Sequence, residues 1–362
     1  MTPNEPSDHR QSAPVSSSRF LSGRSVLVTG GTGTIGSEIV RQVLGHQPRV
    51  LRVFSRDETR QVELREELGD RPCLRFLIGD IRDRARLDTA LEGIEVVFHA
   101  AALKHVPACE YNPFEAVQTN VVGTQNLLQA CRETGVERFV YISTDKAVNP
   151  TNTMGATKLL AENLVRATQE FSPSLLLSTV RFGNVLGSRG SLLPVLSQRI
   201  DSESRVGVTS TEMTRFMMTI RDAVSLVLES ARASSGGETC ILRMPALRVI
   251  DLVEVFVEEY CSVRGRDPRD VEIVETGIRP GEKLHEELLT LSEYARVIRR
   301  DETYVVQPPA RLGTRIEVAT PSELPDEFHS ARAPLLGRDA IRNLIQRSGI
   351  LETHRQLEEE RA

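Results

Sequence analysis

Short apolar segments alternate with amphipathic ones through the first half of the chain, and this alternation restricts the fold more than any other feature. Six segments have the length and composition of buried strands: residues 25–29, 50–54, 74–78, 95–99, 139–142 and 175–180. Helical spacing lies between them, notably over residues 35–44, 114–131 and 152–167. Strands that alternate with helices predict a parallel sheet covered on both faces. Because such crossovers are right-handed, we expect an α/β fold with a doubly wound parallel Rossmann sheet.

A glycine-rich turn follows the first expected strand. Glycines recur there at a spacing of three, at Gly30, Gly33 and Gly36. This spacing permits a tight turn and a close approach of the backbone to a ligand, and the free N–H groups of the next helix attract a pyrophosphate. With a strand before it and a helix after it, the turn predicts dinucleotide binding by residues 30–36, which include Thr32, Thr34 and Ile35.

The end of the second strand indicates which nicotinamide dinucleotide binds. Ser55 and Arg56 stand there, and a hydroxyl beside a guanidinium suits the 2′-phosphate of NADP. Asp57 comes next, and in the alternative interpretation it binds the ribose of NAD while Arg56 is solvated. The sequence therefore favours NADP and leaves NAD possible.

The next two strand ends carry further candidates for the cofactor site. Asp80 and Ile81 follow the third strand, where a carboxylate can accept a hydrogen bond from an adenine amine. Small residues that fit against a dinucleotide follow the fourth strand: Ala100, Ala101 and Ala102. In the alternative interpretation Asp80 only caps a helix and the alanines only permit close packing.

The second half of the chain is less regular, and it predicts a second lobe. After a loop over residues 183–191 come a helix over 219–233, strands over 239–242 and 271–275, and a helix from Asp251. We expect residues 21–182 and 219–240 to form the dinucleotide-binding Rossmann domain, and residues 183–218 and 241–310 to form a smaller C-terminal substrate-binding lobe. Residues 1–20 resemble a disordered tail, and residues 311–362 an extension with one helix over 340–346.

Composition excludes several classes of function. The net charge of −5 gives no reason to expect nucleic acid as a partner. No apolar run approaches the roughly 20 residues of a membrane span, so we expect no membrane insertion. The 5 cysteines are scattered without Cys-x-x-Cys spacing, and the 7 histidines form no His-x-x-x-His pair. We therefore expect no disulfide framework, no metal and a reducing cytoplasm.

Ionisable side chains gather after the fifth strand. Asp145, Lys146 and Lys158 lie in the string STDKAVNPTNTMGATK, which begins where that strand ends and continues into a helix. In open parallel sheets this edge binds ligands. A tyrosine four residues before Lys158 would complete the Tyr-x-x-x-Lys pair of short-chain dehydrogenases, and Met154 stands there instead.

This string resembles the active-site segment of the UDP-N-acetylglucosamine 4,6-dehydratase family, an extended short-chain dehydrogenase group of the polysaccharide-biosynthesis type. The resemblance covers about residues 20–310. It continues in FSRDE (54–58), AALKHVP (101–107), NVVGT (120–124), RFGNV (181–185), GSRGS (187–191), MTRF (213–216) and RPGEKLHE (279–286). Some members of the group also carry methionine in place of the tyrosine, so Met154 is compatible with activity.

The resemblance implies a redox-neutral elimination on a nucleotide sugar. NADP takes a hydride from C4, the resulting ketone acidifies C5–H, water is lost across C5 and C6, and the hydride returns to C6. The product is a 4-keto-6-deoxy sugar nucleotide.

The same resemblance assigns roles to the residues after the fifth strand. Lys146 is the base for C5–H if burial and Lys158 lower its pKa, and a buried Asp145 is the acid that protonates the leaving hydroxyl. Lys158 bonds the nicotinamide ribose. Met154 cannot accept a proton, so Thr144 or Asp145 is the candidate for the 4-hydroxyl proton. In the alternative interpretation the Asp145–Lys146 pair is an ordinary surface salt bridge.

The substrate is expected to contact both lobes. Guanidinium groups suit a diphosphate, an amide can bond the sugar or a phosphate, and a carboxylate can accept from the ribose hydroxyls. The candidates are Lys104, His105, Asn184, Arg189, Arg215, Arg279 and Glu282. Relatives pair through the helices over residues 114–131 and after Asn152, so a homo-oligomer is expected.

Two other functions stay open at this point. A nucleotide-sugar 4-epimerase needs a base for the 4-hydroxyl but no acid–base pair for elimination. A dinucleotide-sensing protein without catalysis would explain the missing tyrosine. The retained Asp145, Lys146 and Lys158 favour the dehydratase over both.

Overall fold

The computed structural model describes residues 20–309, 320 and 324–352, so the expected tail over residues 1–20 lies almost wholly outside the described residues. Its larger part is a nine-stranded sheet in the order β13-β14-β10-β6-β5-β4-β1-β2-β3. The parallel strands are β1 (Ser25–Thr29), β2 (Val50–Ser55), β3 (Leu74–Ile78), β4 (Val96–His99), β5 (Arg138–Ile142), β6 (Leu176–Arg181) and β10 (Thr239–Leu242). The expected doubly wound Rossmann sheet is confirmed.

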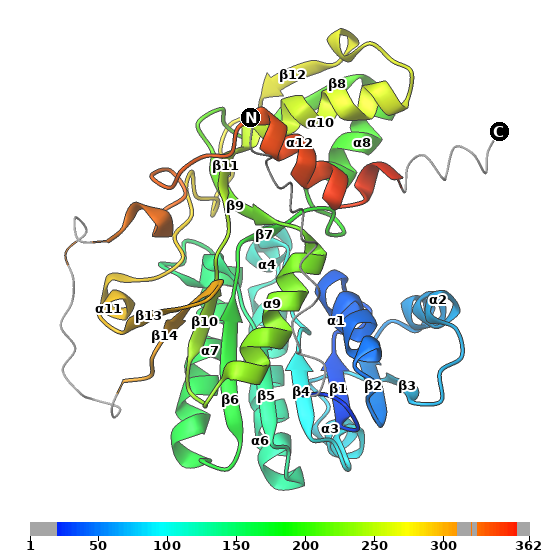
Figure 1. Cartoon of the computed structure of the whole chain (residues 1–362), viewed down its shortest axis with the longest axis vertical. Helices are drawn as coiled ribbons and strands as arrows, with labels where there is room; N and C mark the ends of the chain where they lie inside the picture. The colour runs from blue at the N-terminus through cyan, green and yellow to red at the C-terminus, as the bar shows by residue number, and fades with distance from the viewer. Residues whose placement is uncertain (1–19, 310–319, 321–323, 353–362) are drawn as a thin grey trace, which may run out of the picture.

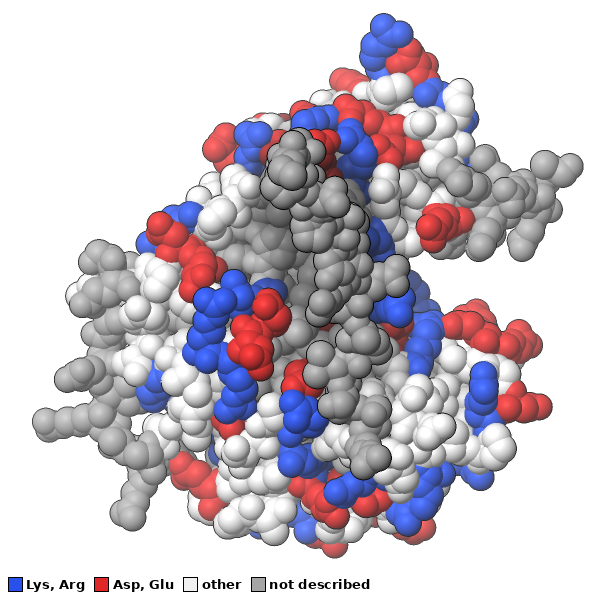
Figure 2. All heavy atoms as spheres, viewed as in Figure 1, with Lys and Arg blue, Asp and Glu red and all other residues white. Residues whose placement is uncertain are grey.

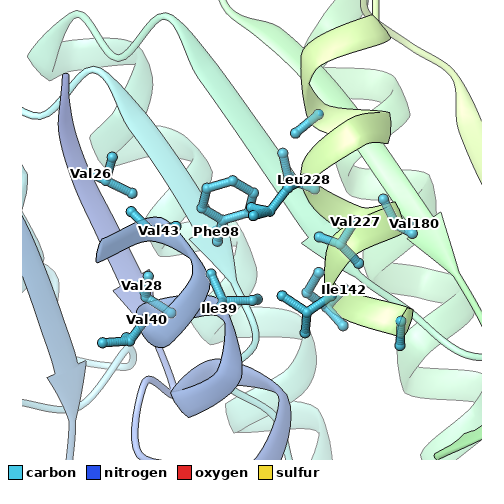
Figure 3. Packing of buried hydrophobic residues seen from close by; sticks show 14 of the residues in the cluster. Val26, Val28, Ile39, Val40, Val43, Phe98, Ile142, Val180, Val227 and Leu228 are labelled. Carbon is cyan, nitrogen blue, oxygen red and sulfur yellow. The ribbon is translucent and has the colours of Figure 1, made fainter. Parts of the chain in front are cut away.

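Side chains alternate between two hydrophobic layers because successive residues of a strand point to opposite faces. On β1, Val26 and Val28 belong to the layer shown in Figure 3, whereas Leu27 belongs to the opposite layer. The first layer also contains Phe98, and Val227 reaches it from a helix. Strands buried on both faces are the reason why these segments are almost continuously apolar.

Helices cover both faces of the sheet, as Figure 1 shows. One face carries α1 (Thr34–Gly45) and α9 (Ile220–Ala233), which pack against each other. The helices whose apolar side chains enter the opposite layer are α3 (Arg84–Leu91), α6 (Gly123–Thr134) and α7 (Thr153–Phe171). At one edge α2 (Glu58–Leu68) follows β2. The helix over residues 219–233 therefore packs on the sheet, as the sequence predicts.

The helix expected over residues 114–131 is interrupted. The chain instead forms α4 (Val106–Tyr111), α5 (Pro113–Val117), a π-helical turn η2 (Gln118–Val122) and then α6. Asn120 in this turn accepts from the Leu103 N–H at 2.8 Å and donates to the Leu103 carbonyl at 3.0 Å and to the Thr157 hydroxyl at 3.0 Å. The turn thus ties the loop after β4 to α7, and such π-helical turns are frequent near functional sites.

A hairpin extends the large sheet and changes the expected division of the chain. β13 (Val297–Arg300) pairs with β14 (Thr303–Val306), and β14 pairs antiparallel with β10. Residues 241–310 were expected in the smaller lobe, but these strands lie in the Rossmann sheet. Four-residue strands joined by a tight turn give no sequence signal of the edge to which they attach, since that choice depends on tertiary packing.

The smaller lobe has its own hydrophobic core. Helices α8 (Leu192–Glu203) and α10 (Val249–Val263) pack there beside a two-stranded parallel sheet of β8 (Arg205–Val208) and β12 (Glu272–Glu275). A three-stranded sheet connects this lobe to the larger one through β7 (Asn184–Val185), β9 (Thr214–Met218) and β11 (Ala246–Arg248). Short elements complete the chain: η3 (Asp145–Ala147), η4 (Pro268–Asp270), α11 (Leu291–Tyr294) and η6 (Asp326–Phe328).

The helix expected over residues 340–346 is α12 (Arg338–Arg347), and it belongs to the smaller lobe. Its apolar side chains Ile341, Leu344 and Ile345 are buried in the core that α10 also fills. Figure 1 shows α12 beside α10 at the end of the molecule opposite the lower edge of the sheet. The chain therefore returns to this lobe after contributing the β13–β14 hairpin to the sheet.

Candidate active site

Two positions in the turn over residues 30–36 require glycine. Gly30 has φ +64°, and a Cβ there would lie 2.7 Å from the backbone nitrogen of Ala101. A Cβ on Gly36 would lie 2.1 Å from the Gly30 carbonyl oxygen. Both distances are shorter than atoms tolerate, so the glycines are needed for β1, α1 and the loop after β4 to approach each other. Gly33 is the N-cap residue of α1, which begins at Thr34.

A cavity of about 480 Å³ opens beside this turn. Its lining includes ten residues expected to bind the cofactor: Gly30, Thr32, Gly33, Ser55, Arg56, Asp80, Ile81, Ala100, Ala101 and Ala102. Thr34 lines a neighbouring cavity, and Ile35 and Gly36 lie in the first turns of α1. A narrow backbone turn at a helix N-terminus, next to a cavity with small residues, fits a dinucleotide.

The far side of this cavity contains a charged cluster. Asp80 accepts from Arg82 at 2.7 Å, and its carboxylate lies 3.6 Å from the Arg56 guanidinium. Burial acts to raise the pKa of Asp80, but the hydrogen bonds from Arg82 outweigh it and lower that pKa. Asp83, not Asp80, is the N-cap residue of α3, so the alternative interpretation of Asp80 as a helix cap is wrong.

Asp57 is the N-cap residue of α2. Its side chain accepts from the Arg60 N–H at 3.1 Å, and it also forms an ion pair with the Arg60 guanidinium at 3.2 Å. A carboxylate used in this way is less available to a ribose hydroxyl, whereas Arg56 is half exposed at the cavity. At the end of β2, Arg56 is therefore the charged side chain that lines the cavity without a helix-capping role.

The short helix η3 places Asp145 and Lys146 at the end of β5. Asp145 is fully buried, and its Oδ1 accepts from the Lys146 Nζ at 3.0 Å and from the Thr144 hydroxyl at 2.9 Å. Its Oδ2 is buried and makes no hydrogen bond. Asn184, at the start of β7, accepts from the Lys146 Nζ at 3.5 Å. An ion pair at this depth is not a surface salt bridge, so that alternative interpretation is wrong.

Glu286 completes the cluster, although no role was expected for it from the sequence. Its side chain is 2% exposed, its Oε1 lies 3.2 Å from the Lys146 Nζ, and its Oε2 makes no hydrogen bond. Arg215 lies next to it, with its Nε 3.8 Å from the same Oε1. We call Asp145, Lys146 and Glu286 the charged triad. The available signal was its place as the last residue of the string RPGEKLHE over residues 279–286.

The pKa of Lys146 differs from the sequence expectation. Burial alone lowers this pKa, but the charges of Asp145 and Glu286 outweigh burial and raise it. Lys146 is therefore an ammonium group in this structure and not a ready base. The expectation was wrong because it considered burial and Lys158 but not a second carboxylate.

Lys158 lies in α7 and has the pKa that was expected of Lys146. Burial lowers its pKa to about 7, although Glu162 acts in the opposite direction. Its Nζ donates to the Ile142 carbonyl at 2.5 Å and lies 4.2 Å from the centroid of the Tyr141 ring. Met154, one turn earlier, is buried in a small apolar cluster with Cys109 and Ala116.

The three candidate arginines have three different environments. Arg189 contacts the Thr32 carbonyl, and its N–H donates to the Thr34 hydroxyl at 3.1 Å, so it sits on the glycine turn. Arg215 is buried and donates to the Thr214, Leu284 and Lys283 carbonyls. Arg279 is exposed in the loop after β12. The structure therefore does not bring these guanidinium groups together.

The remaining candidates lie on the loops after β4 and β12. The Lys104 Nζ donates to the Arg189 carbonyl at 2.9 Å, and burial lowers the pKa of Lys104. The His105 ring lies so close to Gly190 that a Cβ there would be 2.8 Å from its Cε1. Glu282 accepts from the Arg279 N–H at 3.4 Å. Lys104 and His105 thus contact the 187–191 loop, while Glu282 stays with Arg279.

The loop that carries Glu286 is fastened to the loop that carries Lys146. Asn152 donates to the Gly281 carbonyl at 2.8 Å, and the Lys283 Nζ donates to the Val148 carbonyl at 2.7 Å. These bonds connect the segment after β12 with the N-terminus of α7. They explain how residues far apart in the sequence form one charged cluster.

Comparison with known proteins agrees with this geometry. The profile of the family described as "Polysaccharide biosynthesis protein" matches residues 26–308. The chain belongs to this family. Its fold is that of extended short-chain dehydrogenases of the nucleotide-sugar dehydratase and epimerase type, and such proteins use a nicotinamide dinucleotide.

Three similar proteins illustrate the family. A Methanocaldococcus jannaschii protein named "Uncharacterized membrane protein MJ1061" is 50% identical over 91% of this chain and 97% of its own length. A Campylobacter jejuni protein (serotype O:23/36) named "UDP-N-acetylglucosamine 4,6-dehydratase (inverting)" is 36% identical over 81% of this chain and 85% of its own. The structure of Pen from Bacillus thuringiensis has a TM-score of 0.83 and 41% identity, and the match covers 91% of this chain and 98% of Pen.

The surface and the helices add two observations. Within residues 20–309, 320 and 324–352, no helix combines the length and the apolar character that crossing a membrane requires. On the face drawn in Figure 2, positive and negative side chains are interspersed and not gathered by sign.

Proposed function

We propose that the protein catalyses the NADP-dependent 4,6-dehydration of UDP-N-acetylglucosamine to a 4-keto-6-deoxy sugar nucleotide. The observation that carries this proposal is the buried Asp145–Lys146 pair at the end of β5, at the same sheet edge as the glycine turn. A carboxyl and an amine in contact can supply the acid and the base of an elimination. The relative from Campylobacter, whose name states this activity, supports the choice of substrate.

The cofactor would be held by the glycine turn, by Ser55 and Arg56 at the ribose, and by Ala100–Ala102 along its length. When bound, it accepts a hydride from C4 of the sugar and returns it to C6. Lys158 is proposed to donate a hydrogen bond to the nicotinamide ribose. One N–H of its ammonium group donates to the Ile142 carbonyl, and two N–H groups are left for the ribose. Arg56 and the engaged Asp57 support NADP rather than NAD.

The proton transfers belong to the charged triad. Removal of the C5 proton needs a neutral Lys146, and departure of the 6-hydroxyl as water needs a protonated Asp145. A single proton transfer across their 3.0 Å hydrogen bond produces both forms together. Lys146 then takes the C5 proton and later returns a proton to C5, while Asp145 gives its proton to the leaving hydroxyl.

The 4-hydroxyl proton needs another acceptor, because the Met154 thioether cannot take it. Thr144 donates its hydroxyl proton to Asp145 at 2.9 Å. We propose that, as hydride leaves C4, this hydroxyl accepts the 4-hydroxyl proton and its own proton passes to solvent, so that Asp145 stays free to take the Lys146 proton. After Lys146 has reprotonated C5, one proton from solvent returns to Lys146, so the residues end the cycle as they began.

A test of the function is the mass of the product. Purified protein is incubated with NADP and UDP-N-acetylglucosamine in D₂O, and the product is examined by mass and proton spectra. Dehydration predicts the loss of one water and incorporation of deuterium at C5. An unchanged mass with inverted C4 indicates the 4-epimerase instead, and no change with several sugar nucleotides indicates a sensor of dinucleotide.

We also propose that the protein forms a homo-oligomer through an apolar patch on α4, α5 and α7. Tyr111 is 88% exposed, Phe114 is 82% exposed and Leu160 is 48% exposed. Exposed aromatic side chains on adjacent helices are typical of association surfaces. Phe114→Asp should reduce the mass measured by light scattering, whereas Phe171→Asp at the far end of α7 should not.

A cytoplasmic location is proposed on the state of the cysteines. Cys73, Cys109, Cys131, Cys240 and Cys261 are all free. Unpaired thiols are typical of proteins kept in a reducing compartment. Fractionation of cells that express the protein tests this, and recovery with the membrane fraction would contradict it.

A further inference from the structure

The chain uses lysine sparingly, and its lysines surround the candidate active site. Only four of its 45 basic side chains are lysines: Lys104, Lys146, Lys158 and Lys283. Arginine stays charged at any accessible pH, whereas a lysine amine can lose its proton when its surroundings change. Three of these amines donate to backbone carbonyls, of Arg189, Ile142 and Val148. Lys146 alone among the four lies in contact with carboxylates in the described structure, and it contacts two.

The second of these carboxylates is held firmly. The Glu286 N–H donates to the Ser330 hydroxyl at 2.8 Å, and its carbonyl accepts from the Ser330 N–H at 2.9 Å. The Ser330 hydroxyl also lies 2.7 Å from that of Thr214, on β9. These bonds fix the backbone of Glu286, whose carboxylate contacts Lys146 from a different loop than Asp145.

We propose that Glu286 is a positioning residue that controls the proton of Lys146: its ionised form keeps the amine charged, and its protonated form lets that proton pass to Asp145. This inference rests on the proposed dehydration, in which Lys146 is the base. It goes beyond that proposal because it names Glu286 as the residue whose protonation makes the neutral form of Lys146 accessible.

The charge balance explains the control. With Glu286 ionised, the Lys146 ammonium faces two carboxylates, and transfer of its proton to Asp145 would leave an anion beside a neutral amine. With Glu286 protonated, one carboxylate faces the ammonium, and transfer leaves three neutral groups in a buried site. Burial favours the neutral set. The Glu286 proton is not consumed, because within one turnover Lys146 regains its proton and Asp145 returns to the carboxylate form.

Some groups around Glu286 raise the pKa of its carboxyl and others lower it. Burial and the Asp145 charge raise the pKa of Glu286, while Lys146, Arg215 on β9 and Lys283 on its own loop lower it, and the result is a raised pKa. The protonated form is therefore more accessible than for an ordinary glutamate. As the pH rises through that pKa, Glu286 ionises and the active proton arrangement is lost.

The experiment compares Glu286→Gln with the wild type in two measurements. The substituted amide keeps the shape of a protonated glutamate at every pH. The pH profile of kcat for dehydration should lose the alkaline fall that Glu286 ionisation causes in the wild type, while KM changes little. Glu286→Asp keeps an ionisable group and should retain the fall.

The matched control is Glu287→Gln, the same change at the next residue, which should leave the profile unchanged. Equal loss of activity at all pH values, with the alkaline fall in place, would overturn the proposal.

The second measurement does not depend on activity. Protein labelled with [ε-¹³C]lysine gives four side-chain signals, and Lys146→Arg identifies the one from Lys146. In Glu286→Gln the titration midpoint of this signal should move down by about one pH unit or more, because a carboxylate 3.2 Å away no longer stabilises the ammonium. An unchanged midpoint in a variant that still binds NADP contradicts the proposal. If the wild type dehydrates no sugar nucleotide, the proposed function fails while this midpoint still reports on the Glu286–Lys146 contact.

Discussion

The glycine turn and the charged triad lie at the same edge of the sheet but are specified in different ways. The turn consists of backbone, and its demands are met within residues 30–36 and the adjoining loop at Ala101. The triad consists of side chains, and it joins η3 to a loop that follows β12 in the other lobe. A local segment can therefore encode the first site, whereas the second exists only once the chain has folded.

This difference predicts different responses to mutation. A change in the turn should damage cofactor binding through steric collision, and nothing nearby can compensate for a backbone clash. A change in the triad should leave the cofactor bound and alter proton transfer, because each member affects the charge of the other two.

Lys146→Ala should lower dehydration at least about 100-fold, since it removes the proposed base for C5–H. Exchange of C5–H with D₂O should fall by the same factor, and NADP affinity should stay within about twofold. The measurements are turnover by product mass and cofactor binding by calorimetry. Exchange that persists in this variant would show that another group is the base.

Gly36→Ala should weaken NADP binding by about 10- to 100-fold, because its Cβ would lie 2.1 Å from the Gly30 carbonyl and relief of such overpacking costs about 1–3 kcal/mol. Calorimetry of cofactor binding measures the effect. Gly45→Ala is the control in the same helix, with no atom within 4 Å of the added Cβ. Equal affinities in both variants would mean that the turn does not hold the cofactor.

Arg56→Ala should weaken binding of NADP about tenfold, in line with the loss of one charge-assisted hydrogen bond, and should leave NAD binding nearly unchanged. Titration with each cofactor gives the ratio of affinities. Arg71→Ala, which removes an exposed guanidinium bonded only to the Leu68 carbonyl among the described contacts, serves as the control. A parallel loss for NAD and NADP would contradict a role at the 2′-phosphate.

Lys158→Met should change the pH dependence of stability in the cofactor-free protein. The folded pKa of Lys158 is about 7, below the ordinary 10.5, so the unfolded chain binds more protons between these values. Stability therefore rises with pH in this window, by at most about 1.4 kcal/mol per pH unit, and the variant should lack that rise. Urea unfolding at pH 7, 8 and 9 measures it, and identical slopes in both proteins would contradict the low pKa.

Lys146 should behave in the opposite way, which sharpens the contrast between the two lysines. Its pKa is raised above 10.5, so its contribution to stability is complete at neutral pH and is lost only as the pH rises through the folded pKa. Lys146 itself should therefore contribute no slope to the stability between pH 7 and 9, in contrast to Lys158.

The sequence predicted the parts of the molecule that local patterns determine. The six strands, the glycine turn and the position of Asp145 at a strand end all follow from periodicity and spacing, and each lies where expected. The role of Asp57 as N-cap was not foreseen, because a capping carboxylate and a ribose-binding one occupy the same place in the sequence. The π-helical turn at Asn120 was also missed, since it depends on bonds to Leu103 and Thr157.

Long charged side chains were the hardest to predict. Arg189, Arg215 and Arg279 share one residue type and one expected role, yet the first sits on the glycine turn, the second is buried among carbonyls and the third is exposed. Rotamer freedom lets such a side chain reach several partners, so the fold and not the motif selects its contact. Glu286 was missed for the same reason, and with it the raised pKa of Lys146.

Because lysine is scarce, reagents that attack primary amines can modify few side chains of this protein. Aldehydes and activated esters that would decorate the surface of most proteins meet few side-chain targets here, and these targets line the reaction centre. Labelling with such a reagent, followed by peptide mapping with and without sugar nucleotide, would thus show which lysines the substrate protects. Arginine does not react with these reagents, so its side chains would add no background labelling.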